Sequence, residues 1–216
     1  MTRWKQTSLL LAVGCLATIL VEQVRQGRAQ SVAVTNDELA AAVREYSPPP
    51  RIWYQKDKAP RLTLPNGREE VVHSVLNVTK PMRFGGYVWD DSGIPPGPVW
   101  IRIDLARQIM SVFRGGHEIG SAVILYGTDG KPTPMGSFAI LEKDQDYHSR
   151  TYDAPMPYML RLTNDGVAIH GSDVRKGRAT HGCTGVPIAF ARLLFAQASK
   201  GDEVVILPAG PSAKRI

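Results

Sequence analysis

The sequence contains few cysteines and no long apolar run, and both absences restrict its function. Its 216 residues include only Cys15 and Cys183, and no His-Glu-x-x-His segment occurs. Zinc motifs with Cys-x-x-Cys or His-Glu-x-x-His spacing are therefore excluded. The longest apolar run, Ser8 to Val21, has 14 residues. A membrane-spanning helix needs about 20, so this run is short for a spanning segment.

A dominant charge is also missing. The net charge of +6 falls to +3 once residues 1–29 are set aside, because they hold four of the 26 basic and one of the 20 acidic residues. The remaining 22 basic and 19 acidic residues form no basic run interleaved with aromatic residues. The sequence therefore predicts no nucleic-acid partner.

Apolar residues, in contrast, are abundant enough for a real core. They make up 43% of the chain, against 21% for charged residues, and this balance is typical of folded proteins. The length fits one domain of ordinary size with extra segments before it.

Residues 1–29 have the pattern of an export signal. Arg3 and Lys5 precede the apolar run, and Gly27-Arg28-Ala29 offers small residues at the two positions that a signal peptidase reads. We expect cleavage before Gln30, with an uncleaved anchor as the alternative. The protein is then expected in the periplasm or cell envelope, in contact with a membrane only through this signal or anchor.

Export changes the meaning of Cys183. After cleavage it is the only thiol left, and it has no internal disulfide partner in an oxidising compartment. Such a cysteine is buried, paired between chains or kept for its reactivity. The pattern draws attention to Cys183 before any motif is considered.

Residues 30–97 are uneven in composition. A capping box at Thr35 to Glu38 and the Ala-rich run to Tyr46 predict a short helix, which Pro48 ends. Strand-like pieces such as 70–78 follow, separated by Pro and Gly. We interpret residues 30–97 as a linker or accessory region.

Residues 98–208 are regular. Alternation at Val99, Ile101 and Ile103 predicts a half-buried strand, and Asn164-Asp165-Gly166 predicts a hairpin turn. Further strands are expected at 108–113, 118–126, 136–141, 158–162, 167–170 and 204–207.

One helix is expected late in the chain, beginning near Pro187 and ending near Gly201. Its apolar stripe would comprise Ile188, Ala191, Leu194, Phe195 and Ala198. We predict a mostly β fold, a sandwich or barrel-like catalytic domain over residues 98–208 with one main C-terminal helix, and a tail at 209–216.

Two histidines, His170 and His181, lie within 13 positions of Cys183. A thiol becomes a nucleophile at neutral pH when a base or a positive environment favours its thiolate. His170 ends a predicted strand, and Gly171 lets the chain turn and return Cys183 toward it. The N–H groups of Gly182 and Cys183 can face a developing oxyanion. These residues predict a cysteine nucleophile with a histidine base.

Four segments, taken in order, resemble the L,D-transpeptidase family. Residues 131–138 are similar to that family's Thr-Pro-Thr-Gly-Thr-Phe strand entry, and Met156-Pro157-Tyr158 is similar to its Met-Pro-Tyr segment. Ile169-His170-Gly171 and Thr180-His181-Gly182-Cys183 are similar to its Ile-His-Gly and Ser/Thr-His-Gly-Cys segments. The resemblance runs from about residue 98 to residue 207.

The resemblance implies a role for each matching residue. Cys183 would be the nucleophile, His170 the base, and the carbonyl of Gly171 the group that holds the imidazole in its useful tautomer. Thr180, His181 and Gly182 would shape the site or its oxyanion hole, and Tyr158 would line the substrate cleft. No metal and no cofactor are implied.

The same resemblance implies the reaction. Cys183 would attack the carbonyl of the third residue of a peptidoglycan tetrapeptide stem, releasing D-alanine and leaving a thioacyl-enzyme. An amine on a neighbouring stem would then resolve it to a 3→3 crosslink. The expected partners are therefore peptidoglycan stem peptides, while the oligomeric state is left open.

One departure from the family concerns Gly185, where Arg or Asn is usual. The loop from His170 to Thr180 is also short for the family, and it contains Arg175, Lys176 and Arg178. These cations, Arg178 among them, are candidates for stem carboxylates. A solvated basic loop is the alternative.

Other interpretations of the cysteine segment stay open. Cys183 could be a small buried hydrophobe, or a zinc ligand with His181 and His170, although no fourth ligand is evident. The chain could also be a wall-binding protein without turnover, or use water as acceptor and act as a carboxypeptidase or endopeptidase.

Overall fold

Strands dominate the described part of the chain, residues 50–65 and 67–209 of the computed structural model, and one helix accompanies them there. The expected mostly β fold with a main C-terminal helix is thereby confirmed. The expected export signal at 1–29, the helix at 35–46 and residues 210–216 of the tail lie outside the described residues.

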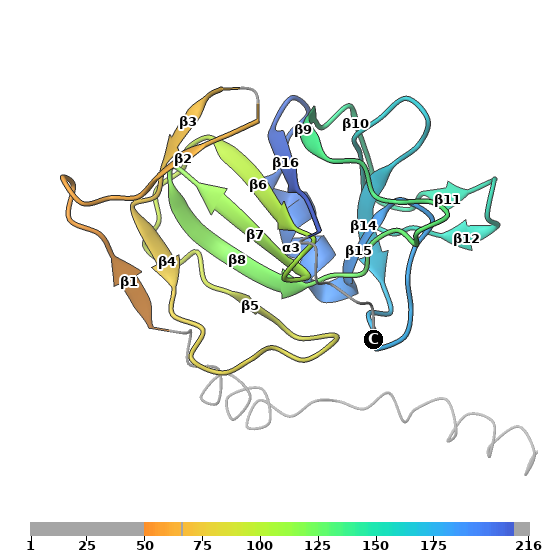
Figure 1. Cartoon of the computed structure of the whole chain (residues 1–216), viewed down its shortest axis with the longest axis horizontal. Helices are drawn as coiled ribbons and strands as arrows, with labels where there is room; N and C mark the ends of the chain where they lie inside the picture. Colours follow the sequence, from red (N-terminus) through yellow and green to blue (C-terminus); the bar gives the residue numbers. More distant parts are fainter. Residues whose placement is uncertain (1–49, 66, 210–216) are drawn as a thin grey trace, which may run out of the picture. The chain divides into compact units, whose positions relative to one another are not determined.

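Eight strands form the larger sheet (Figure 1). Their order is β1-β4-β8-β7-β6-β16-β9, and β5 pairs with β8. The central strands β6, β7 and β8 are antiparallel, whereas β16 runs parallel to β6. The bounds are β1 Arg51–Trp53, β4 Ser74–Leu76, β5 Tyr87–Trp89, β6 Val99–Asp104, β7 Ile109–Arg114, β8 His117–Val123, β9 Gly136–Ala139 and β16 Glu203–Leu207.

A smaller sheet of four strands includes the strand that contains His170 and the strand that directly follows Cys183. Its order is β10-β13-β14-β15, with bounds Glu142–Asp144, Met159–Arg161, Ala168–Ser172 and Thr184–Pro187. The predicted hairpin turn at 164–166 is confirmed, because it joins the antiparallel strands β13 and β14. The N–H of Leu162 donates to the carbonyl of Val167 at 2.8 Å across it.

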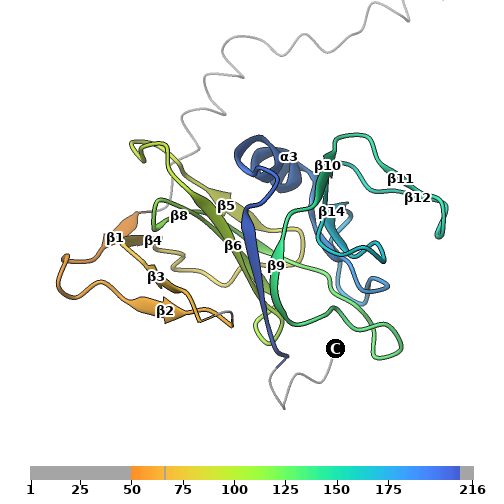
Figure 2. The ribbon, with the colours of Figure 1, turned by 90° about the horizontal axis from the view of Figure 1, so that it is seen from above.

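Two hairpins stand outside these sheets. Strands β2 (Arg61–Thr63) and β3 (Glu69–Val71) form one, and β11 (His148–Ser149) and β12 (Ala154–Pro155) form the other. In Figures 1 and 2 the β11–β12 hairpin extends beyond the smaller sheet, away from the larger one.

The main core lies between the two sheets and helix α3 (Ile188–Gln197). Figure 2 shows α3 beside β16 on one side and β10 and β14 on the other. The fully buried members from each element include Ile101, Ile103, Met110, Ile119, Ile124, Leu160, Ile169, Val186, Phe190 and Leu194. Because β14 contributes Ile169 to this core, alternate residues of β14 face away from it.

The helix differs from its expected form. Its buried residues are Phe190, Ala191 and Leu194, whereas Ile188 is 51% exposed. It ends at Gln197 and not near Gly201, which instead lies in the turn before β16 with φ +91°. Most of the expected apolar stripe is confirmed, because Ala191, Leu194 and Ala198 are buried and Phe195 packs against the core. Ile188 is the exception, and Phe190, which the prediction left out, is buried.

Strand β6 is buried on both faces, so the expected half-buried strand is wrong. Ile101 and Ile103 face the main core, and Trp100 on the opposite face is only 2% exposed. Trp100 stacks on Phe113 at 4.3 Å and packs with Leu64 and Val72. Residues before 98 thus cover the outer face of the larger sheet and supply β1, β4 and β5 to it.

The division of the chain at residue 98 stays a prediction.

Within residues 50–65 and 67–209, no helix combines the length and apolar character needed to cross a membrane.

Candidate active site

His170 lies in the middle of β14, on the face opposite the main core. Its neighbour Ile169 is buried in that core, so the period of two turns His170 the other way. The strand is held on both sides, because β13 pairs with it antiparallel and β15 pairs with it parallel. In this register Ile169 lies beside Thr184 and His170 beside Gly185. His170 therefore lies next to β15, the strand that begins directly after Cys183.

The segment that carries Cys183 is fixed by backbone hydrogen bonds on its other side too. Leu125 and Gly185 exchange N–H to carbonyl bonds at 2.8 and 3.0 Å, and the N–H of Thr180 donates to Tyr126 at 3.0 Å. Residues 180–185 are thus held between β14 and the extension of β8. Rigid elements on both sides position a nucleophile better than a free loop would.

Gly182 has a conformational role. Its φ is +107°, in a region that L side chains rarely adopt. A Cβ there would meet only Pro132 and Val167, both at 3.7 Å, which is ordinary contact. Close packing is therefore not the reason for glycine at this position. The reason is the backbone turn that precedes Cys183.

Thr180 closes the same turn. Its hydroxyl donates a hydrogen bond to the carbonyl of Cys183, so its side chain stabilises the conformation of the cysteine segment. This contact gives Thr180 a site-shaping position. The oxyanion role of the Gly182 and Cys183 N–H groups stays a prediction.

The imidazole of His170 is oriented by the residue after it. Its Nδ1 lies 2.9 Å from the carbonyl oxygen of Gly171. A carbonyl can only accept, so Nδ1 carries the proton and Nε2 of the neutral ring is the acceptor. This is the hydrogen bond implied for Gly171 by the family resemblance, and it leaves Nε2 as the candidate base.

Burial keeps both groups of the pair uncharged. It lowers the pKa of His170 below the ordinary value of 6.5, against a smaller opposing effect of the bond to Gly171. It raises the pKa of Cys183 above the ordinary 9.0, and the carboxylate of Asp165 adds to that increase. At neutral pH the site therefore holds a thiol and a neutral imidazole, which are the protonation states that a general base and its nucleophile need before proton transfer.

The half-buried thiol has mainly apolar surroundings. Cys183 packs against Met156, Met159 and Ala168. Its Sγ lies 3.8 Å from the carbonyl oxygen of Gly166, in the hairpin turn. This packing is the source of the burial that keeps the thiol protonated.

The second histidine of the motif occupies a different environment. His181 is exposed, and its ring stacks on Tyr152 with centroids 4.6 Å apart and planes at 16°. Tyr152 lies in the turn of the β11–β12 hairpin. His181 thus shapes the surface beside Cys183. Nothing in the sequence pointed to Tyr152, since 29 positions separate the two rings.

Tyr158 and Arg178, the predicted substrate contacts, have partners within the protein. The Tyr158 ring packs edge-on against Phe195 of α3, with centroids 5.8 Å apart. Arg178 is exposed, with Nη1 3.7 Å from the Asp173 carboxylate, and Arg175 pairs with the same carboxylate at 2.7 Å. Their roles toward substrate stay predictions.

Gly185, the departure from the family pattern, occupies a filled position. A Cβ there would lie 3.0 Å from the Cβ of Ser172 and 3.5 Å from that of Leu125. An arginine or asparagine would therefore require Ser172 to shift. Any cation that binds substrate has to come from another position.

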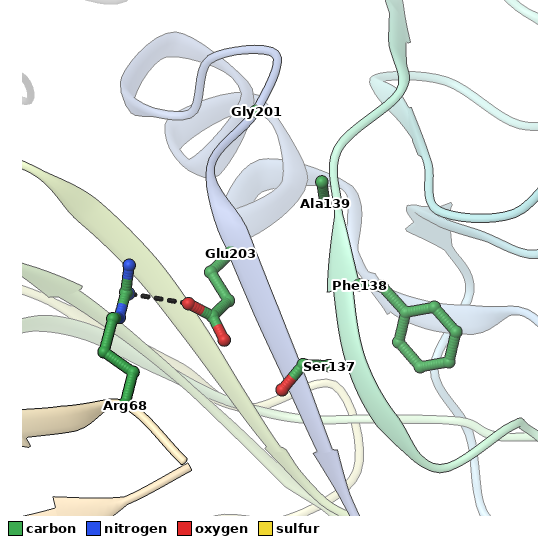
Figure 3. A pocket seen from close by; sticks show the side chains of 6 residues that line it. All are labelled: Arg68, Ser137, Phe138, Ala139, Gly201 and Glu203. Atoms are coloured by element: carbon green, nitrogen blue, oxygen red, sulfur yellow. Dashed lines mark ion pairs between the residues drawn. The ribbon is translucent and has the colours of Figure 1, made fainter. Parts of the chain in front are cut away.

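Cavities and ligand clusters elsewhere do not involve these residues. A cavity of about 330 Å³ is lined by Arg68, Ser137, Phe138, Ala139, Gly201 and Glu203 (Figure 3), where Arg68 pairs with Glu203 at 2.7 Å. It lies along β9 and β16, and its lining includes neither His170 nor Cys183. In the described ranges, no three His, Cys, Asp or Glu side chains are grouped so that they could bind a metal ion.

Comparison with solved structures shows a related fold. An L,D-transpeptidase from Stackebrandtia nassauensis is 22% identical with a TM-score of 0.50, over 56% of this chain and 63% of that chain. One from Mycobacterium tuberculosis is 19% identical with a TM-score of 0.47, over 51% and 57%. The catalytic domain of the E. faecium enzyme is 27% identical with a TM-score of 0.43, over 50% and 96%. The chain thus spans less than two thirds of the first two proteins.

The sequence comparisons differ in outcome. Curated proteins gave no match. The YkuD family model, described as the L,D-transpeptidase catalytic domain, matches residues 98–206, just over half of the chain. That range contains His170, Gly171 and the whole segment from Thr180 to Cys183. This chain therefore belongs to the family of L,D-transpeptidase catalytic domains.

Proposed function

We propose that this protein is an exported cysteine L,D-transpeptidase that acts on peptidoglycan stem peptides in the cell envelope. One observation carries the proposal: the Gly171 carbonyl holds the proton of His170 on Nδ1, beside the strand that follows Cys183. That arrangement leaves Nε2 to accept a proton, as a general base for a thiol must. The family membership names the reaction class.

The first half of the reaction forms a thioester. As Sγ of Cys183 attacks the carbonyl of the third stem residue, Nε2 of His170 takes the thiol proton. The N–H groups of Gly182 and Cys183 would receive the developing oxyanion. The C–N bond then breaks, and D-alanine leaves with the proton from the His170 imidazolium.

The second half transfers the acyl group. The amine of a neighbouring stem attacks the thioester, and His170 accepts its proton. The C–S bond breaks, Sγ leaves as thiolate and is reprotonated by His170, and a 3→3 crosslink remains. With water as the nucleophile the same steps give a free tripeptide, which is the carboxypeptidase alternative.

Export is the part of the proposal that rests on residues 1–29. A basic start, an apolar run of 14 residues and small residues before Gln30 support a secretory signal. Peptidoglycan stems lie outside the cytoplasm, so a substrate of this class requires such a signal. Periplasmic or cell-envelope localisation is proposed on that basis.

Incubation of the purified protein with a disaccharide-tetrapeptide tests the chemistry. Intact mass is expected to increase by the mass of the stem minus D-alanine, and Cys183→Ala is expected to show no increase. Appearance of dimer then supports transfer, and appearance of free tripeptide supports hydrolysis. If Cys183 reacts with an alkylating agent but never takes up the stem, the proposal fails and a wall-binding protein without turnover is favoured.

The rate of acylation is expected to rise with pH through an ionisation below 6.5 and then to level off. Burial lowers the pKa of His170, so the base is unprotonated from mildly acidic pH upward. Burial raises the pKa of Cys183, so the thiol keeps its proton until above pH 9.0. Initial rates of D-alanine release measured from acidic to alkaline pH check this, and a midpoint above 6.5 would contradict it.

A further inference from the structure

Three side chains form an aromatic and cationic cluster beside the cysteine segment: Lys131, Tyr152 and His181. The His181 ring stacks on Tyr152, and Lys131 Nζ donates a hydrogen bond to the Tyr152 hydroxyl at 2.9 Å. The same ammonium lies 5.5 Å from the centre of the Tyr152 ring. Three contacts thus join the turn of the β11–β12 hairpin to two other segments of the site.

The cluster adjoins the nucleophile. His181 precedes Cys183 by two residues, and the carbonyl of Pro132, next to Lys131, lies 3.7 Å from the Cβ position of Gly182. The carboxylate of Asp165 acts electrostatically on both Cys183 and Lys131. It adds to the effect of burial on the thiol of Cys183, and to the effect of the Tyr152 bond on Lys131. The ammonium therefore stands at the edge of the cysteine site.

Lys131 differs from the other cations near the site. Arg175 and Arg178 are both paired with Asp173, and Gly185 has no side chain. Lys131 is exposed, and its hydrogen bond is to a neutral hydroxyl. That bond raises the pKa of Lys131, so the amine stays charged. Of Lys131, Arg175 and Arg178, Lys131 is the one that forms no ion pair with a carboxylate in the described part of the chain.

We propose that Lys131 Nζ, held by Tyr152, binds the terminal carboxylate of the donor stem peptide. This inference rests on the proposed function. The carboxylate of the leaving D-alanine is attached to the carbon next to the scissile nitrogen, so it lies within one residue of the carbonyl that Cys183 attacks. A donor longer by one residue moves its carboxylate by about 3.3–3.6 Å. Lys131 thereby selects tetrapeptide over pentapeptide donors.

The test compares two substrates that differ only in terminal charge. We expect the disaccharide-tetrapeptide with a free carboxylate to exceed its C-terminal carboxamide in kcat/KM by about 10-fold, the value of a hydrogen bond to a charged group. Lys131→Met should bring this ratio close to one, and Lys131→Arg should retain most of it. Lys200→Met removes another exposed lysine and should leave the ratio unchanged.

Two outcomes would overturn the inference. One is a ratio that stays at 10-fold in Lys131→Met, whether or not both substrates lose activity equally, since Lys131 would then at most position the hairpin. The other is a ratio close to one in the unmodified protein, since no group would then recognise the terminal carboxylate. If neither substrate turns over, the proposed function has failed, but Lys131 can still be tested. Calorimetric Kd values for both peptides on Cys183→Ala, with and without Lys131→Met, then report the carboxylate preference directly.

Discussion

Replacing His170 with glutamine is expected to slow acylation of Cys183 by roughly 1,000-fold, within the range that a general base contributes. Glutamine keeps a polar side chain beside the Gly171 carbonyl, but it cannot take a proton. The loss should be large here because burial raises the pKa of the Cys183 thiol. Little thiolate forms without a base, so no second route to the nucleophile is open at neutral pH.

His181→Gln is the matched comparison, because His181 is the other histidine within 13 positions of Cys183. Its exposed ring stacks on Tyr152, and its removal should cost less than His170→Gln. Single-turnover mass spectrometry with the tetrapeptide gives both acylation rates. The rise of rate below pH 6.5 should also vanish in His170→Gln alone. A larger loss in His181→Gln would reverse the assignment of the base.

Gly127→Ala is expected to lower the free energy of unfolding by about 3 kcal/mol, at the upper end of ordinary overpacking costs. A Cβ at Gly127 would lie 2.1 Å from the carbonyl oxygen of Lys131 and 2.7 Å from the nitrogen of Thr133. Both are backbone atoms and cannot rotate away. The buried N–H of Gly127 also donates to the Thr133 hydroxyl at 2.9 Å, and a shift of the loop would break that bond.

Gly130→Ala provides the control in the same turn. A Cβ at Gly130 would have no heavy atom within 4 Å, and the change should stay within about 0.5 kcal/mol. Denaturant unfolding of both variants measures the difference. A similar loss in both would show that glycine is needed for the turn itself and not for the close approach of the backbone at Gly127.

The parts of the fold that sequence predicted well depend on short windows of residues. Asn164-Asp165-Gly166 specifies its hairpin through turn chemistry, and the alternation from Val99 to Ile103 specifies a strand through the period of the pleat. The burial of individual side chains was harder to predict from sequence. Trp100 is buried because Leu64 and Val72 cover it, and the amino-acid pattern around Trp100 contains no information about that cover.

The candidate site divides in the same way. His170, Gly171 and Cys183 could be proposed from sequence because they lie close together in the chain. A thiol that gives its proton to a base requires a cysteine and a histidine, and both are next to a glycine here. The cluster of Lys131, Tyr152 and His181 could not be found. Its members come from three segments, and Tyr152, which joins the other two side chains, lies in none of the motifs.

The mostly β fold and the family were therefore readable from the chain alone, and the sequence also led to the predictions of export, of a cysteine nucleophile and of a histidine base. Tertiary packing was needed for everything that depends on distant segments meeting. It buries the thiol and imidazole enough to keep both neutral, fills the space at Gly185 with Ser172, and brings Lys131 against Tyr152. Residue type and spacing determine which chemistry a group can perform. Its neighbours follow from the tertiary contacts, and its charge state follows from how far the folded chain shields it from water.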